Sequence, residues 1–515
     1  MLTGKKIILF GAGVIGHRAL IYFGDDRIQC FVDNNKAGQI FLNKEVISFE
    51  EALGIIGDYD IVLSVGETLI EEIEEQCRNH SVKYSKLYDI IPRNKILINS
   101  AIELYKEKKN SIRDLLGKKP AASMEFTQPI GPHRDLIDQT FLYVDEYTRV
   151  VAFVPIELLY SETTESSKSK AKNISSEWEY HHSKHENLPI AKFWPHRNLY
   201  RFFIYGTEMP AEYLEWYEKT FSTRNIPALK ASDILNKRYN EFVFMQQELS
   251  LNGLFYFIEN PVPANWNSRG YFNLTDGHHR SVFLLEMGLR FVPVSMERKD
   301  YFAWRNDEAA ISVQNVIMET NRHDFYTPIL NPFYIKLSAY RDNFNKSRLM
   351  RVMEAMKNIR LNGKRVLDIG SNMGYMSQHF YREGAHVVCL EPDMFHLQLA
   401  NELQNLSYSK CEMYQTPFEE YDADQPFDIC VLLTVFYHII RKGSDWDKFI
   451  GKLNQYVESL IIWESGDDYV YEKEFIISNT KFKHYKHLSY TYGTGKLREL
   501  GIFIIDPHYL DSPTE

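Results

Sequence analysis

Runs of consecutive apolar residues alternate with helical periodicity in two separate parts of the chain. Apolar runs of this kind indicate strands that are buried on both faces, as in parallel sheets covered by helices. The predicted strands lie at Lys6–Phe10, Gln29–Val32, Ile61–Val65, Val366–Ile369, His386–Leu390 and from Phe427 onward. The pattern therefore predicts two α/β units, one toward each end of the chain.

Between these two units the pattern changes twice. Residues 101–120 have a charged helical periodicity that predicts a linker helix, and residues 121–315 mix helical and strand patterns. Within them, Ser161–Glu177 is a polar low-complexity stretch that predicts a loop. We expect a multidomain α/β protein divided into residues 1–100, 101–120, 121–315 and 316–515, the last segment beginning with a helical connector.

Composition narrows the class of protein. With 515 residues the chain is too long for one hydrophobic core. Its net charge of −10 argues against a general role in binding nucleic acid. The five cysteines show no paired or metal-binding spacing, and no apolar run has the length of a membrane span. These features predict a cytoplasmic protein with no nucleic-acid partner and no integral membrane segment.

The segment Gly363–Met376 (GKRVLDIGSNMGYM) combines a strand, a glycine-rich turn and the start of a helix. Glycines suit such a turn because its backbone must approach a ligand closely. The next predicted strand ends in Glu391, whose carboxylate can accept two hydrogen bonds from a ribose diol. A third strand begins at Phe427 and is followed by a predicted aromatic loop. A dinucleotide-binding Rossmann domain is the alternative, but the turn lacks G-x-G-x-x-G spacing.

These three segments, in this order, resemble class I S-adenosylmethionine-dependent methyltransferases over roughly residues 340–510. The resemblance implies a seven-stranded Rossmann-like sheet with S-adenosylmethionine as its cofactor. It implies that Glu391 binds the ribose and that Gln415 or Thr416 lies beside the adenine. The residues it places around the methionine moiety are Asp368, Gly370, Ser371, Asn372 and Gly374. Asn372 is a departure, because many relatives have glycine there; asparagine is tolerated if the residue keeps a negative φ, which we expect.

The same resemblance places Phe436, Tyr437 and His438 toward the methyl acceptor. Methyl transfer from a sulfonium needs mainly in-line positioning, unless the acceptor must lose a proton. In that case His438 is the candidate general base. The alternative is a packed histidine with no catalytic role.

A second motif, Thr275-Asp276-Gly277-His278-His279-Arg280, follows the predicted strand Tyr271–Leu274 and opens a helix. Histidine and arginine donors at a helix N-terminus can hold the phosphates of ATP or another nucleotide, and Asp276 could hold Mg²⁺. The alternative is a turn in which these side chains only satisfy local carbonyls and acids.

This motif resembles the phosphate-binding DGHHR sequence of free-serine kinases with the ParB/sulfiredoxin fold. Val151–Leu159 resembles their opening strand, and Glu162 lies where those kinases have a catalytic glutamate. The resemblance implies that Glu162 is a general base for phosphoryl transfer and that Gly277, His278, His279 and Arg280 bind nucleotide phosphates. About seventy residues separate Glu162 from a predicted helix around Arg238–Leu249, so we expect an acceptor larger than serine. DNA partitioning is disfavoured because no helix-turn-helix pattern is present.

The long insertion after Glu162 is rich in histidine, with the cluster HHSKH at 181–185 and a further histidine at His196. Such a cluster could bind a metal ion. A solvated loop is the favoured interpretation.

At the N-terminus, Gly11, Gly13 and Gly16 form a complete G-x-G-x-x-G pattern after a strand, and the next strand ends in Asp33. This arrangement predicts binding of a dinucleotide or nucleotide-sugar. It resembles the small Rossmann domains of bacterial sugar-modifying and surface-polysaccharide enzymes. The alternative is a docking or oligomerisation module without a ligand.

Taken together, a kinase-like unit and a methyltransferase-like unit resemble the bifunctional chain terminators of O-antigen polysaccharides, also at Val435–Ile439 and Leu488–Asp506. This resemblance implies phosphorylation followed by methylation of a sugar or polysaccharide acceptor, with docking to a glycan-assembly enzyme. Two alternatives remain open. The central unit could be a nucleotide-binding switch, or the Rossmann-like units could be inactive scaffolds.

Overall fold

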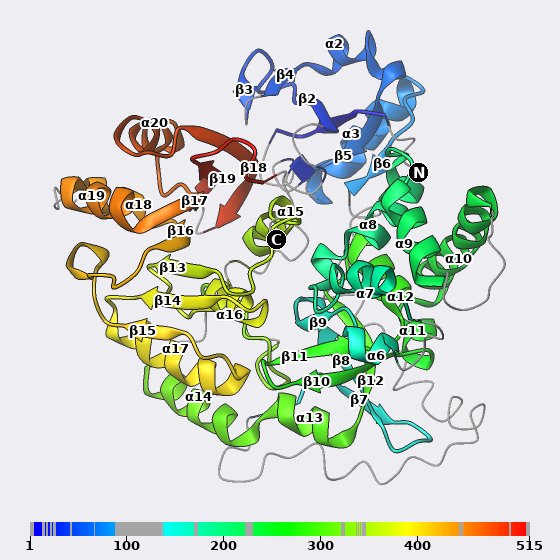
Figure 1. Ribbon diagram of the computed structural model, residues 1–515. Coiled ribbons are helices and arrows are strands. Elements are labelled where there is room, and N and C mark those ends of the chain that lie inside the picture. Colours follow the sequence, from blue (N-terminus) through cyan, green and yellow to red (C-terminus); the bar gives the residue numbers. More distant parts are fainter. Residues whose placement is uncertain are drawn as a thin grey trace.

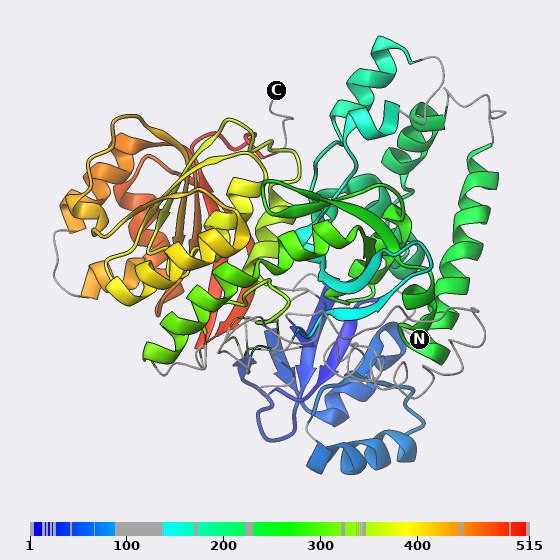
Figure 2. The same ribbon diagram turned by 90° about the horizontal axis from the view of Figure 1, so that it is seen from below.

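The computed structural model describes residues 5–12, 16, 19–20, 23, 27–41, 44–65, 67–87, 136, 138–168, 174–221, 230–320, 325–335, 337, 339, 341, 347–441, 446–493 and 496–510. The linker helix predicted at 101–120 lies outside these residues. The described strands form three sheets, of six, six and seven strands. In Figure 1 the N-terminal unit lies at the top, the central unit at the right and the C-terminal unit at the left, and Figure 2 separates the same three units from below.

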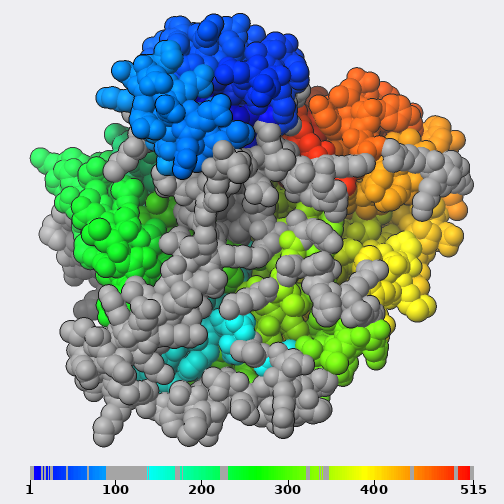
Figure 3. All heavy atoms as spheres, turned by 180° about the vertical axis from the view of Figure 1, so that it is seen from behind, coloured from blue at the N-terminus to red at the C-terminus, as the bar shows by residue number. Residues whose placement is uncertain are grey.

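The N-terminal unit is a parallel sheet apart from the antiparallel pair β3–β4, with strand order β3-β4-β2-β1-β5-β6. Its elements are β1 (Ile7–Phe10), β2 (Ile28–Val32), β3 (Ile40–Phe41), β4 (Lys44–Ile47), α2 (Phe49–Leu53), β5 (Asp60–Leu63), α3 (Glu67–Asn79) and β6 (Ser85–Lys86). Successive residues of β1 pack alternately into two apolar clusters, because successive side chains of a strand point to opposite faces of the sheet. Figure 3 shows this unit capping one end of the molecule.

The central unit has a mixed sheet with the order β7-β8-β12-β10-β11-β9. Its strands are β7 (Phe141–Val144), β8 (Val150–Pro155), β9 (Leu159–Tyr160), β10 (Val262–Asn267), β11 (Tyr271–Leu274) and β12 (Phe291–Met296). Its helices include α6 (Thr164–Lys168), α7 (Ser176–Ser183), η5 (Ile190–Lys192), α8 (Trp194–Tyr205), α9 (Ala211–Phe221), α10 (Ala231–Asn252), α11 (Phe255–Glu259), α12 (His278–Glu286), α13 (Arg298–Arg305) and α14 (Asp307–Thr320).

Two predictions for this unit are wrong. The strand expected at Val151–Leu159 is broken, because a 3-10 turn at Ile156–Leu158 separates β8 from β9. The loop expected at Ser161–Glu177 contains α6 and the start of α7. Ser175 caps α7 by accepting a hydrogen bond from the Trp178 amide, so a residue typical of loops acts here as a helix start.

The C-terminal unit has a seven-stranded sheet with the order β15-β14-β13-β16-β17-β19-β18, parallel except at β19. Its strands are β13 (Arg365–Ile369), β14 (His386–Leu390), β15 (Glu412–Tyr414), β16 (Phe427–Leu433), β17 (Val457–Glu464), β18 (His484–Gly493) and β19 (Lys496–Ile504). Its helices are α15 (Arg348–Ala355), α16 (Tyr375–Arg382), α17 (Met394–Ser407), α18 (Phe436–Arg441), α19 (Trp446–Tyr456) and α20 (Tyr469–Asn479). The aromatic loop expected after β16 is helix α18, which corrects that prediction.

One continuous apolar core joins the central and C-terminal units. It includes Leu158 and Phe272 from the central sheet together with Met376 and Phe380 from α16. Lys192 and Glu383 form a buried ion pair of 2.6 Å across the same boundary. The site-bearing loops of the two units are therefore fixed relative to each other. Of the described helices, none has both the length and the apolar character needed to cross a membrane.

Candidate functional site

The central motif lies at the end of β11, where Gly277 has a φ of +83° and precedes α12. Its neighbour His278 approaches the predicted glutamate, since the Glu162 amide lies 3.4 Å from His278 Nε2. These two residues are 116 positions apart in the chain. The fold thus brings Glu162 to the N-terminal end of the helix that the motif opens.

The remaining residues of the motif differ in their surroundings. His279 is half-buried, and its two ring nitrogens each lie 3.2 Å from a tyrosine hydroxyl, of Tyr200 and Tyr213. Burial lowers the pKa of His279 well below its ordinary value, so the ring is neutral. Arg280 donates to the backbone carbonyl of Pro261 at 3.3 Å and also to that of Asn260. Asp276 is exposed, with 81% of its side chain accessible.

The histidines of the insertion are not on a solvated loop, which corrects that expectation. His181 and His182 lie on α7, and burial lowers the pKa of His182 and brings that of His185 to about 3. His196 on α8 is fully buried, and its ring lies 4.3 Å from that of His279. Among the described residues no group of three or more His, Cys, Asp or Glu side chains could hold a metal ion.

In the N-terminal unit, Gly11 has a φ of +106°, and a Cβ there would lie 2.7 Å from the Ser64 carbonyl oxygen. A Cβ on Gly16 would lie 1.8 Å from the Gly11 carbonyl oxygen, so the helix approaches the turn too closely for any side chain. Asp33 accepts hydrogen bonds from the Ala12 and Asn35 amides, each at 3.1 Å. Gly13 lies outside the described residues.

The turn of the C-terminal unit joins the carboxyl end of β13 to α16. Gly370 and Gly374 have φ values of +69° and +72°. A Cβ on Gly370 would lie 2.5 Å from a methyl carbon of Val435, so the close approach also requires glycine. Asn372 has a φ of +52°, which corrects the expectation of a negative value. Asparagine tolerates this left-handed conformation better than most residues.

Glu391 follows β14 and is 7% exposed. Its Oε2 accepts a hydrogen bond from the Asn372 amide at 2.8 Å, and its Oε1 accepts one from the Asp393 amide at 3.0 Å. A carboxylate has about four lone-pair positions, so two remain for further donors. Glu391 therefore shapes the turn and keeps acceptor capacity for a diol.

Asp368 lies at the end of β13, where it accepts a hydrogen bond of 2.5 Å from the Ser377 hydroxyl. Burial raises the pKa of Asp368 to about 6, against the opposing effects of Ser377 and Arg348. Beside it on the turn, Ser371 Oγ and Asn372 Oδ1 are buried and bond to no described group. Buried polar atoms of this kind need partners, so these residues fit a polar ligand such as an amino-acid moiety.

The other predicted ligand residues lie on neighbouring strand ends. Gln415 and Thr416 follow β15, which pairs with β14, so the three adjacent strands β13, β14 and β15 present the set along one edge. Ligands of open α/β sheets bind at this carboxyl edge. Tyr437 and His438 lie on α18 with their rings 3.8 Å apart, and His438 is exposed. Phe436 is completely buried against Phe449, so its predicted position facing the acceptor is wrong.

Comparison with known proteins identifies the matching segment of this unit. Residues 367–459 match the family described as "Methyltransferase domain". The C-terminal unit thus contains a methyltransferase domain over these residues. Ubiquinone biosynthesis O-methyltransferases of Rhodopseudomonas palustris (strain HaA2) and Bradyrhizobium sp. (strain ORS 278) are each 30% identical to this chain over 92 residues. That alignment covers 18% of this chain, which thus spans about a third (35%) of each relative.

Two solved structures show weaker likeness. The bifunctional kinase-methyltransferase WbdD has a TM-score of 0.32 and 18% identity, over 38% of this chain and 46% of that one. Magnesium protoporphyrin IX methyltransferase of Synechocystis PCC 6803 with bound SAM has a TM-score of 0.26 and 14% identity, over 31% of this chain and 79% of that one. Likeness at this level is too weak to bear on function.

The methyltransferase domain also has a buried polar cluster that the sequence did not reveal. Glu464, at the end of β17, is inaccessible to solvent and is 2.9 Å from Arg341 Nη2 and 3.2 Å from Arg348 Nη1. Thr434, directly after β16, donates to Glu464 Oε2 at 2.7 Å, and the Tyr326 hydroxyl lies 3.2 Å from Thr434 Oγ1. Positions 108 to 123 residues apart meet here, so no local sequence pattern could have predicted the cluster.

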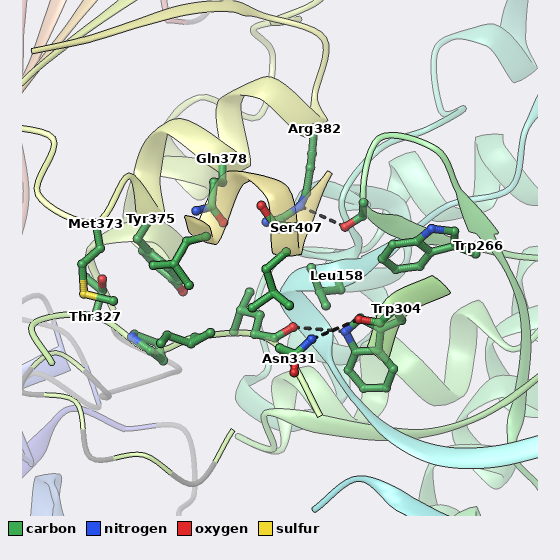
Figure 4. Close-up of a pocket in the computed structure, with 16 residues that line it drawn as sticks. Leu158, Trp266, Trp304, Thr327, Asn331, Met373, Tyr375, Gln378, Arg382 and Ser407 are labelled. Carbon is green, nitrogen blue, oxygen red and sulfur yellow. Dashed lines mark hydrogen bonds between the residues drawn. The ribbon is translucent and has the colours of Figure 1, made fainter. Parts of the chain in front are cut away.

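A separate pocket lies where the methyltransferase domain meets the central unit (Figure 4). Met373 and Gln378 line it from the cofactor turn and α16, and Trp266 and Trp304 line it from the central unit. Arg382 also lines it and donates from Nε to the Gly270 carbonyl at 3.0 Å. None of the predicted cofactor ligands is among the residues that line this pocket, so it is distinct from the predicted binding edge.

Proposed function

We propose that this chain methylates an acceptor by using S-adenosylmethionine, after its central unit has phosphorylated that acceptor. The acceptor we propose is a sugar or surface polysaccharide. The observation that carries the methyltransferase part is the alignment of Asp368, the Gly370–Gly374 turn and Glu391 on adjacent strand ends of the matched domain. The central unit is proposed to have the ParB/sulfiredoxin fold.

Each of these groups has a distinct role in the proposed site. When bound, S-adenosylmethionine supplies a methyl group on a positively charged sulfur. Glu391 holds the ribose hydroxyls, while Ser371 and Asn372 offer their unpartnered polar atoms to the amino-acid moiety. Ionised Asp368 supplies a negative charge beside that moiety. Gln415 and Thr416 border the adenine, and the acceptor enters past Tyr437 and His438.

The methylated atom is proposed to be an oxygen. Both curated relatives named above are O-methyltransferases, and each is 30% identical to this chain over 92 residues. An oxygen acceptor that is a hydroxyl must lose a proton in the reaction, and so requires a general base.

The kinase proposal for the central unit depends on the contact between Glu162 and the motif. The Glu162 amide lies 3.4 Å from His278 Nε2, and Gly277 leads into the N-terminal end of α12. A nucleotide whose phosphates lie at this helix end would place its terminal phosphate within reach of an acceptor held by Glu162. Exposed Asp276 is proposed to hold Mg²⁺ together with those phosphates.

A nucleotide-binding switch without phosphoryl transfer is the second candidate for this unit. It is favoured by Arg280, whose guanidinium is engaged with the backbone carbonyls of Asn260 and Pro261. It is also favoured by His279, whose two ring nitrogens are each within hydrogen-bonding distance of a tyrosine hydroxyl. Fewer side chains are then available to the phosphates than the sequence suggests.

The N-terminal unit is proposed to bind a nucleotide-sugar or a dinucleotide, or to act as a docking module for a second copy or a glycan-assembly enzyme. Asp33 supports both alternatives. Its two carboxylate oxygens each accept one backbone amide, which stabilises the turn and leaves acceptor positions for a ribose.

Calorimetry with S-adenosylmethionine tests the methyltransferase proposal. We expect the wild-type chain to bind and Glu391→Ala to lose roughly 100-fold or more in affinity, because charged hydrogen bonds contribute about 1.5–3 kcal/mol each. Glu412→Ala is the matched control, since Glu412 lies at the opposite, amino end of β15 and is 45% exposed. Equal affinity in all three proteins would contradict the proposed site.

Nucleotide turnover tests the central unit. We expect Glu162→Gln to abolish ATP turnover in the presence of a glycan acceptor while nucleotide binding persists. If the wild-type chain binds the nucleotide but does not turn it over, the result would support the nucleotide-binding switch instead. Mass spectrometry of the acceptor then distinguishes gain of phosphate plus methyl from gain of methyl alone.

A further inference from the structure

Tyr326 lies at the carboxyl edge of the methyltransferase sheet, beside the predicted cofactor turn. Its hydroxyl is 3.2 Å from Thr434 Oγ1. The next residue, Val435, fills the space in which a Cβ of Gly370 would lie. Tyr326 therefore contacts the residue directly before Val435, the residue that packs against the cofactor turn. It lies at the end of the sheet where α18 begins.

Two guanidinium groups surround the ring of Tyr326. Arg341 donates to the hydroxyl oxygen from Nε at 3.2 Å and from Nη2 at 3.0 Å. Arg341 and Arg348 also lie over the ring face, 5.3 and 5.1 Å from its centroid. A phenol oxygen that accepts hydrogen bonds from a cation is arranged to carry negative charge.

The arginines are themselves held in place by Glu464, which is fully buried and contacts both of them. Thr434 and Thr491 also donate to this carboxylate. Arg348 also interacts with Asp368, so the two guanidiniums face two carboxylates, and the Tyr326 hydroxyl shares their donors.

We propose that Tyr326 is the proton acceptor for methyl transfer, an inference that rests on the methyltransferase function proposed above. The O–H bond of the acceptor breaks and its proton passes to the ionised Tyr326 Oη. The freed electron pair on the acceptor oxygen forms the bond to the methyl carbon. The bond between that carbon and sulfur breaks, and its electron pair stays on sulfur. The sulfonium and phenolate charges are neutralised together, so atoms and charge balance.

The charged groups around Tyr326 support this role. Burial alone raises the pKa of Tyr326 and Glu464 adds to that effect, but the Arg348 and Arg341 guanidiniums lower the pKa below the ordinary tyrosine value. Asp368 faces Arg348 from the neighbouring strand. Every other described tyrosine whose pKa is shifted has it raised. His438, the base expected from the sequence, is instead exposed, with its ring tilted by 35° against that of Tyr437.

The test is an ultraviolet titration of tyrosinate in the full chain. We expect the wild-type protein to show one tyrosine that ionises before the others, and Tyr326→Phe to lack it. Arg341→Gln should retain the tyrosine but shift its ionisation to higher pH. The control is Tyr334→Phe, because burial raises the pKa of Tyr334 and its loss leaves the early titration unchanged.

Calorimetry with S-adenosylmethionine on the same proteins separates the two proposals. Failure of the wild-type chain to bind would contradict the methyltransferase function. If the wild-type chain and Tyr326→Phe both bind the cofactor, and Tyr326→Phe still shows the tyrosine that ionises early, the inference is overturned. With a sugar or polysaccharide acceptor that carries a free hydroxyl, Tyr326→Phe should lower kcat by roughly 100-fold or more while leaving cofactor affinity unchanged. An unchanged kcat would also overturn it.

Discussion

The ion pair between Lys192 and Glu383 joins the central unit to the methyltransferase domain, and replacing Lys192 by methionine tests how tightly they are coupled. Lys192 ends η5, and Glu383 caps the C-terminus of α16, the helix that begins at the cofactor turn. The two side chains are 2% and 5% exposed, and the Nζ–Oε2 distance is 2.6 Å. Methionine keeps the length and apolar stem of lysine and removes only the charge.

The expected cost follows from the burial of both partners. Removing one member of a buried pair leaves an uncompensated charge and typically costs about 3–5 kcal/mol. Replacing both residues by apolar side chains of similar volume is often close to neutral. We therefore expect Lys192→Met to destabilise the boundary by about 3 kcal/mol or more, and Lys192→Met combined with Glu383→Met to recover most of that loss.

Because a chain with several units does not unfold in two states, a local measurement is needed. Hydrogen–deuterium exchange of peptides that cover α16 reports the free energy of local opening there. Lys299→Met is the control, since Lys299 pairs with Glu297 on the surface and both are largely exposed. We expect no measurable change in α16 from that variant.

The effect should also depend on pH. Burial raises the pKa of Glu383, and Lys192 opposes the rise, so loss of Lys192 raises the pKa further. When the pKa of a carboxyl group is higher in the folded than in the unfolded state, the free energy of unfolding decreases as pH rises from the unfolded to the folded pKa. The cost of Lys192→Met should therefore shrink at mildly acidic pH. If at neutral pH Lys192→Met lowers the free energy of local opening of α16 no more than Lys299→Met does, the buried pairing is refuted.

Three further predictions concern the methyltransferase domain and its boundary. Glu464→Gln leaves two buried arginines poorly compensated and should cost about 3 kcal/mol or more, seen as a lower temperature of thermal unfolding. Affinity for S-adenosylmethionine, measured by calorimetry, should rise with pH up to about 6, the pKa of Asp368, because ionised Asp368 favours binding. The rise should be at most about tenfold per pH unit, and Asp368→Asn should remove it. Gly270→Ala should lower the temperature of thermal unfolding more than Gly363→Ala. Both glycines have positive φ, but only at Gly270 would a Cβ lie 1.9 Å from the Ser407 carbonyl oxygen. Equal thermal shifts would mean that the two units do not meet there.

Local sequence patterns predicted the strands well where a strand is short, apolar and followed by a turn. His386–Leu390 is confirmed as β14, and Tyr271–Leu274 is confirmed as β11. The prediction failed where polar residues cap helices, as at Ser175, and where an aromatic run after β16 continues as α18. At α18, for example, Phe436 packs against Phe449 of α19 and Phe475 of α20, and tertiary contacts of this kind override local propensity.

The sequence by itself determined the strand ends that carry Asp368 and Glu391, because the spacing within a βαβ unit fixes which residues reach the carboxyl edge of a sheet. It also indicated the glycines of the turns, since glycine is needed wherever φ is positive and a neighbour lies too close for a Cβ, but it did not indicate the positive φ of Asn372. Only the tertiary structure decided that Tyr326, Arg341 and Glu464 meet beside the cofactor turn. Glu464 lies more than a hundred positions from Tyr326 and Arg341, and these contacts arise from packing between elements that no local spacing specifies.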